Sequence, residues 1–182
     1  MTATPGRPAT SGRPPTIDDL DVIAPGAFAA AVAPLFEGAP RFLGRLAMAR
    51  PFGTADELFA AAGRIAHAMP EDEQIELVNA HPRLGAAPGT VSKLSFREQG
   101  YDRDTGTTVD VATELTRLNE EYEELFGFRY CVFVAGRSRE ALLPDMRASL
   151  TADRDSELHR ALDAVIDVAR DRYAKLSAEE GA

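Results

Sequence analysis

The sequence has a single cysteine, Cys131, and three histidines, so the side chains that most often bind metals are scarce. One cysteine cannot form a disulfide within the chain, which fits a reducing compartment such as the cytoplasm. No cysteine and histidine cluster has the spacing of metal ligands, and no glycine-rich stretch has the pattern of a phosphate-binding loop. We therefore expect any chemistry to be done by side chains alone, without a metal or an organic cofactor.

Long apolar runs and positive charge are also lacking. No run approaches the roughly 20 apolar residues that cross a bilayer, and the N-terminus lacks the pattern of a signal peptide. Acidic residues outnumber basic ones by 29 to 20, which gives a net charge of −9. Nucleic acids and anionic membranes attract concentrated positive charge, so this balance argues against both as partners. A small anionic substrate stays compatible with it, because two arginines can reverse the field inside one pocket.

What is present is the composition of an ordinary globular domain. The 182 residues, 45% of them hydrophobic, are enough for one domain with one core. The first residues are rich in proline, glycine, serine and threonine, which predicts a disordered tail. We place this tail at residues 1–17, the domain at residues 18–177 and a short C-terminal tail at residues 178–182.

Apolar residues at helical spacing, separated by proline and glycine, predict helices through most of the domain. The expected helices begin near Pro25, Phe42, Ala55, Glu71, Ser95, Val109, Ser138 and Ala152. Pro144 is expected to bend or restart the seventh of these helices. The β-like run Tyr130–Val134 has no second strand to pair with, so we interpret it as a buried extended segment. The prediction is an all-α single domain of about eight helices with one extended segment.

His81 is the first candidate for chemistry. It ends a predicted amphipathic helix, and Pro82 and Gly85 prevent that helix from continuing, so the imidazole lies at a chain reversal. A histidine there suits acid–base catalysis, but it also interacts favourably with the helix dipole as a cation. Both interpretations stay open. His67 and His159 lie within helices among charged and small residues, and we expect structural or solvated roles for them.

The second candidate is the segment from Ser95 to Gln99. Ser95 and Glu98 match the capping-box pattern, so they either cap a helix or face a ligand, whereas capping does not explain Gln99. Cys131, flanked by apolar residues, is interpreted as a buried and inert thiol. Arg172 is most simply a solvent-facing arginine of the last helix. The residues alone therefore indicate a possible small-molecule site around His81 and Glu98.

Several pieces, taken in order, resemble the OHCU decarboxylase family (2-oxo-4-hydroxy-4-carboxy-5-ureidoimidazoline decarboxylases). The matching pieces are Arg50-Pro51-Phe52, His81-Pro82-Arg83-Leu84-Gly85, Ser95 with Glu98-Gln99, Leu118-Asn119 with Tyr122, Phe126-Gly127-Phe128, the Tyr130–Val134 run, Arg154, Glu157-Leu158 and Arg172. They cover about Asp18 to Leu176. The resemblance implies an all-α enzyme without a cofactor that performs the last step from urate to (S)-allantoin. It also implies a homodimer.

The resemblance assigns roles to particular residues. His81 corresponds to the family's catalytic histidine and would handle the proton. Glu98 lies in the segment that corresponds to the family's substrate-contacting residues, and we expect it to be a second catalytic residue that orients the substrate. Arg172 would supply positive charge for the anionic substrate. The remaining residues that would bind substrate are Pro82, Ser95, Phe96, Arg97, Gln99, Tyr130, Cys131, Val132, Phe133 and Val134.

The chain also departs from the family pattern. It has no tryptophan, although relatives often carry one in the second helix, and it reads Phe128-Arg129-Tyr130 where relatives commonly have a proline. Neither departure falls on the expected proton-handling residues. Two alternatives stay open: another cofactor-free lyase or hydrolase that acts on a related ureide, and a helical interaction domain without catalysis.

Overall fold

The computed structural model describes residues 15–103 and 108–179, and within these ranges the regular structure is entirely helical. The α-helices are α1 (Ile17–Val22), α2 (Pro25–Val32), α3 (Pro40–Met48), α4 (Ala55–Ala68), α5 (Glu71–Ala80), α6 (Lys93–Glu98), α7 (Val109–Phe126), α8 (Arg139–Ser149) and α9 (Arg154–Glu179). The 3₁₀-helices are η1 (Ala33–Leu35), η2 (Pro88–Thr90) and η3 (Tyr101–Arg103). The predicted all-α class is confirmed. None of these helices combines the length and apolar character that crossing a membrane requires.

Helix α1 corrects the predicted boundary of the N-terminal tail. The Thr16 side chain accepts a hydrogen bond from the backbone N–H of Asp19, whose carboxylate accepts one in return from the Thr16 backbone, and Ile17 is only 9% exposed. Order therefore includes residues 15–17, which composition alone assigned to the tail. Residues 1–14 lie outside the described residues. At the other end α9 continues to Glu179, so residues 178 and 179 are helical, and residues 180–182 lie outside the described range.

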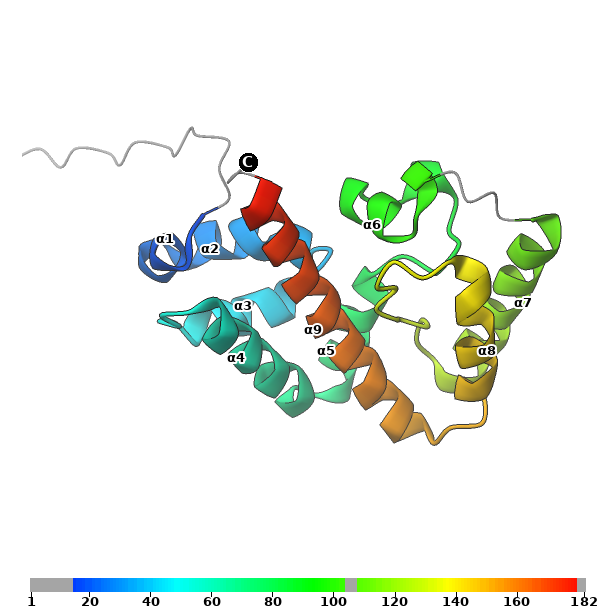
Figure 1. Cartoon of the computed structure of the whole chain (residues 1–182). Helices are drawn as coiled ribbons and strands as arrows, with labels where there is room; N and C mark the ends of the chain where they lie inside the picture. The colour runs from blue at the N-terminus through cyan, green and yellow to red at the C-terminus, as the bar shows by residue number, and fades with distance from the viewer. Residues whose placement is uncertain (1–14, 104–107, 180–182) are drawn as a thin grey trace, which may run out of the picture.

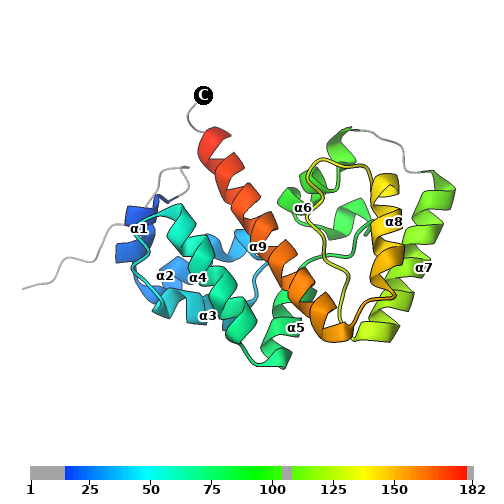
Figure 2. The same ribbon diagram turned by 60° about the horizontal axis from the view of Figure 1, so that its bottom comes forward.

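Helix α9 is the central helix of the molecule. Figures 1 and 2 show it running between a group formed by α1 to α4 and a second group formed by α6, α7 and α8. Its apolar face, which includes Leu158, Leu162 and Val165, is buried in the core. Helices α4 and α5 pack along it and contribute Leu58 and Leu77. Burying each such side chain stabilises the fold by about 1.5–3 kcal/mol.

Local signals explain most helix ends. The Thr54 side chain caps α4 by accepting a hydrogen bond from the backbone N–H of Glu57. Gly127 ends α7 in the left-handed conformation, with φ of 80°, which glycine adopts without steric cost. Helix α8 runs without interruption from Arg139 to Ser149 through Pro144, so of the bend or restart expected at this proline, the restart does not occur.

The segment from Tyr130 to Val134 contains neither helix nor strand, as predicted. Its carbonyl groups are bound by arginine side chains instead of a neighbouring strand. Arg160 donates to the Cys131 carbonyl at 2.9 Å, and Arg137 donates to the Phe133 carbonyl at 2.9 Å. These bonds satisfy main-chain acceptors that a sheet would otherwise pair.

Candidate active site

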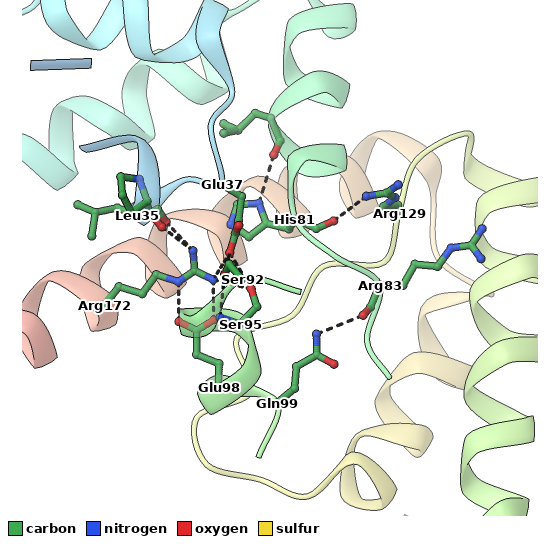
Figure 3. A network of polar contacts seen from close by, with 12 residues as sticks. Leu35, Glu37, His81, Arg83, Ser92, Ser95, Glu98, Gln99, Arg129 and Arg172 are labelled. Carbon is green, nitrogen blue, oxygen red and sulfur yellow. Dashed lines mark hydrogen bonds and ion pairs between the residues drawn. The ribbon is translucent and has the colours of Figure 1, made fainter. Parts of the chain in front are cut away.

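A cavity of about 310 Å³ lies where α6, α9, the turn after α5 and the segment from Tyr130 to Val134 meet. Small-molecule sites typically have volumes of about 300–1,000 Å³. His81 and Pro82 line this cavity from the turn, Glu98 from α6 and Arg172 from α9. The structure thus brings residues 81 and 172, which are distant in sequence, to one site (Figure 3).

His81 is the C-cap of α5 and is only 5% exposed. Its Nδ1 lies 3.3 Å from the Leu77 carbonyl oxygen, which assigns the ring proton to Nδ1 because a carbonyl accepts. Nε2 then carries the lone pair, and it is buried without a hydrogen-bond partner among the described residues. The pKa of His81 is lowered to about 4, mainly by burial and also by the nearby charge of Arg172, while Glu37 and the hydrogen bond to Leu77 act in the opposite direction. The imidazole is therefore neutral near pH 7 and can act as a base.

Glu98 is held by Arg172 through two hydrogen bonds. The Nε and Nη2 groups of Arg172 donate to the two carboxylate oxygens at 2.6 and 2.7 Å. Burial raises the pKa of Glu98 above its usual value, although Arg172 acts in the opposite direction. The paired geometry fixes the orientation of this carboxylate at the cavity.

The structure adds Glu37, which the sequence analysis did not identify. The hydroxyls of Ser92 and Ser95 each donate to its Oε1 at 2.7 Å, and Arg172 Nη2 lies 2.9 Å from the same oxygen. The pKa of Glu37 is lowered: burial raises it, but the two serine hydroxyls and Arg172 outweigh that effect. Before Gly38 in a turn, Glu37 resembles an ordinary surface acid in the sequence, so no local signal predicted this role.

Arg172 is only 2% exposed, which corrects the expectation of a solvent-facing side chain. Besides Glu98 and Glu37, its guanidinium donates to the Ser95 hydroxyl at 2.9 Å and to the carbonyls of Pro34 and Leu35 at 2.9 and 3.2 Å. All three nitrogens of the guanidinium thus bond to acceptors of the protein itself. Arg172 lines the cavity, and its expected contact with an anionic substrate stays a prediction.

The capping interpretation of Ser95 and Glu98 is wrong. Helix α6 begins at Lys93, and its N-cap is Ser92, whose hydroxyl accepts from the Ser95 backbone N–H at 3.1 Å. Ser95 lies inside the first turn and uses its side chain for Glu37 and Arg172 instead. Both residues of the apparent capping box therefore face the polar network of the cavity.

The other predicted residues of this segment divide into three cases. Gln99 lines the cavity, but its Oε1 accepts from the Gly85 N–H at 2.8 Å and its Nε2 donates to the Arg83 carbonyl at 3.2 Å, so it ties α6 to the turn after His81. Arg97 lines the cavity with an exposed side chain that pairs with Glu179. Phe96 is not among the lining residues, and its ring packs 5.3 Å from that of Tyr101, so the structure does not place it at the site.

All five residues from Tyr130 to Val134, which we predict to bind substrate, line the cavity. Burial raises the pKa of Cys131 to about 12, so its thiol stays protonated and is a poor nucleophile. His67 and His159 lie elsewhere, their rings 5.0 Å apart, and His67 pairs with Asp163. In the part of the chain that the structure describes, no three acidic, histidine or cysteine side chains are grouped to hold a metal.

Comparisons with known proteins point to one family. The family model of OHCU decarboxylase matches residues 22–174. The chain is 30% identical over 166 residues to the uric acid degradation bifunctional protein PucL of Bacillus subtilis, covering 91% of this chain but only 33% of PucL. It is 27% identical over 165 residues to the 2-oxo-4-hydroxy-4-carboxy-5-ureidoimidazoline decarboxylase of Haloferax volcanii, covering 91% of this chain and 98% of that protein.

Among solved structures, the fold is similar to that of an OHCU decarboxylase crystallised in the presence of (S)-allantoin. The TM-score is 0.64 at 24% identity, and the match covers 78% of this chain and 93% of that one. The two proteins therefore share the helical fold.

Proposed function

The chain belongs to the OHCU decarboxylase family of urate degradation, and from that premise we propose how its cavity converts 2-oxo-4-hydroxy-4-carboxy-5-ureidoimidazoline to (S)-allantoin. One observation supports the proposal most directly. His81 is a neutral, buried imidazole at the cavity, and its Nε2 has no hydrogen-bond partner in the described residues. A buried polar atom without a hydrogen-bond partner lowers the stability of the fold by about 1–3 kcal/mol. Such an atom in a native structure calls for an explanation, and binding of a ligand is one.

The substrate suits a base of this kind, because it carries a carboxylate and a hydroxyl on one ring carbon. When the bond to the carboxylate breaks, CO₂ leaves and the electron pair passes into the conjugated ring, where a ring nitrogen takes up a proton from solvent and an enol-like intermediate results. His81 Nε2 accepts the hydroxyl proton as the carbonyl forms. A proton must then reach the neighbouring ring carbon from one side, which gives the (S) product.

His81 can also return that proton. Burial destabilises the imidazolium, so a proton taken up by the ring is readily passed on to carbon. A positioned acid–base group of this kind contributes on the order of 10²–10⁴-fold to the rate. One group that both accepts and delivers the proton explains how a cavity of side chains controls the stereochemistry.

The other residues position the substrate. Glu98, fixed by Arg172, would orient the hydroxyl or the ureido N–H groups and disfavour the substrate carboxylate in the ground state. The main chain from Tyr130 to Val134 would bond to the polar edges of the ureide. Arg172 acts as a positioning residue for Ser95 and Glu98, since its own donors are occupied, and Arg97 at the cavity supplies positive charge.

The proposal is tested with freshly generated substrate and circular dichroism. The parent protein should accelerate the appearance of optically active allantoin, whereas uncatalysed decay gives racemate. The control is a His159→Ala variant, because His159 is exposed and lies outside the cavity, and it should match the parent. A parent protein that leaves the product racemic and the rate unchanged would refute the function.

A cytoplasmic location is also part of the proposal. It is supported by the single cysteine, whose thiol is buried and does not form a disulfide. Fractionation of cells that express the full chain would test it.

A further inference from the structure

Arg160 of α9 contacts residues that line the cavity without being among the lining residues itself. Its Nη1 donates to the Cys131 carbonyl at 2.9 Å, and its guanidinium lies 4.9 Å from the centroid of the Tyr130 ring. Both partners belong to the Tyr130–Val134 segment that faces the cavity. Arg160 therefore joins this segment to the central helix.

Glu157 fixes the direction of the Arg160 side chain. It lies one turn earlier on α9, is only 2% exposed and forms an ion pair with Arg160. A buried carboxylate is costly unless it is paired, so Glu157 holds the guanidinium in one place. Both residues of the pair belong to α9, so the guanidinium is held in place by the helix that carries it.

The segment needs such a support because it has no neighbouring strand. Its C-terminal end is bound by Arg137, which donates to the carbonyls of Phe133 and Val134. Arg137 also pairs with Asp145 of α8 at 2.9 Å, so it ties this end of the segment to α8. The hydrogen bond from Arg160 at Cys131 ties the segment to α9.

The same helix also holds Ser95 and Glu98, which line the cavity from α6. Arg172 of α9 binds Ser95 and Glu98, and it lies twelve residues after Arg160, or about 18 Å along the helix axis. A helix of this length is stiff, so it sets how far Glu98 stands from the main chain at Cys131. We propose that Arg160, oriented by Glu157, is a positioning residue that fixes the substrate-facing main chain against α9.

This inference rests on the proposed function and adds two residues to it. If the segment binds the ureide ring in the ground state and the transition state alike, loosening it raises KM and changes kcat little. We expect Arg160→Met to raise KM about tenfold, the effect of losing one charged hydrogen bond. Glu157→Gln should act in the same direction. Guanidinium ion added at millimolar concentration should restore part of the affinity to an Arg160→Ala variant.

Arg154 offers a matched control. It is also an arginine of α9 that binds a main-chain carbonyl, that of Phe126 at 3.0 Å, and it pairs with Glu71, but it does not line the cavity. Arg154→Met should lower the melting temperature and leave KM at the parent value. If Arg160 had only a structural role, Arg160→Met would lower the melting temperature and leave KM at the parent value.

A second readout does not depend on turnover. Hydrogen exchange of the peptide that spans Tyr130 to Val134 should be faster in Arg160→Met than in Arg154→Met. Parental exchange and parental KM in a folded Arg160→Met variant would overturn the inference, as would an equal rise in KM for Arg154→Met. Failure of the proposed function is distinguishable, because it appears as an inactive parent protein whatever the exchange rates are.

Discussion

The three histidines show that the surroundings of a side chain determine its chemical role. His67 of α4 and His159 of α9 contact each other. His81 is buried at the cavity, where Nδ1 bonds to the Leu77 carbonyl of α5 and Nε2 has no partner among the described residues. The stop in the helix at Pro82 made this position predictable from the sequence. The neutrality of the ring was not predictable, because it depends on burial and on Arg172, which is distant in sequence.

This neutrality predicts how stability varies with pH. The folded pKa of His81, about 4, lies below the unfolded value of about 6.5, so the unfolded chain binds more protons between these values. The contribution of His81 to the free energy of unfolding is on the order of 3 kcal/mol. It is fully present above about pH 6.5 and is lost as the pH falls toward 4. Urea unfolding of the parent and of His81→Gln should show a steeper loss for the parent. Parallel pH curves would contradict it.

Glu98 gives a second prediction at this scale. Glu98→Gln keeps the shape of the side chain but leaves the buried Arg172 with Glu37 as its remaining carboxylate partner. We expect a loss of turnover of at least about tenfold, because the neutral amide orients the substrate less strongly. Steady-state kinetics checks this, with the melting temperature as control for folding. Parental turnover would remove Glu98 from the mechanism.

At the scale of elements, α6 shows why a local pattern can mislead. Ser92 and Ser95 are both suitable caps, and the sequence pattern with Glu98 favours Ser95, but the helix begins two residues earlier than predicted. The contacts of Ser95 with Glu37 and Arg172 explain the difference, since they involve residues that no local window contains. Tertiary hydrogen bonds thus override the local capping signal.

Alanine variants of Ser92 and Ser95 should differ in their effects on stability and on activity. Ser92→Ala removes the N-cap and should lower the free energy of unfolding by about 1 kcal/mol. Ser95→Ala keeps the cap but removes a contact of Arg172 at the cavity, so it should lower kcat/KM more than Ser92→Ala does. Denaturant unfolding and steady-state kinetics on both variants decide this. A larger kinetic effect for Ser92→Ala would contradict the assignment.

For the whole molecule, apolar periodicity and helix breakers predicted the all-α class and most helices. Helix α1 was missed because the polar composition of the preceding residues obscured a short apolar stretch around Ile17 and Leu20. The long-range role of Arg172 was suggested only by family resemblance, because helical spacing alone places it with the charged residues of α9. Glu37 was suggested by neither.

The homodimer implied by the family resemblance stays a prediction. Sedimentation equilibrium of the full chain at micromolar concentration should give twice the mass of the 182-residue chain. Dilution should leave the circular dichroism spectrum of the helices unchanged if each subunit folds by itself. A single species with the mass of one chain would contradict the dimer.

The central claim is that His81 carries the proton that sets the product's configuration, and the enantiomeric composition of allantoin tests it most directly. Freshly generated substrate is mixed with the parent, His159→Ala or His81→Ala, and the product is resolved before it racemises. The account predicts (S)-allantoin from the first two and near-racemic product at the uncatalysed rate from His81→Ala. Formation of (S)-allantoin by His81→Ala at the parent rate would contradict it.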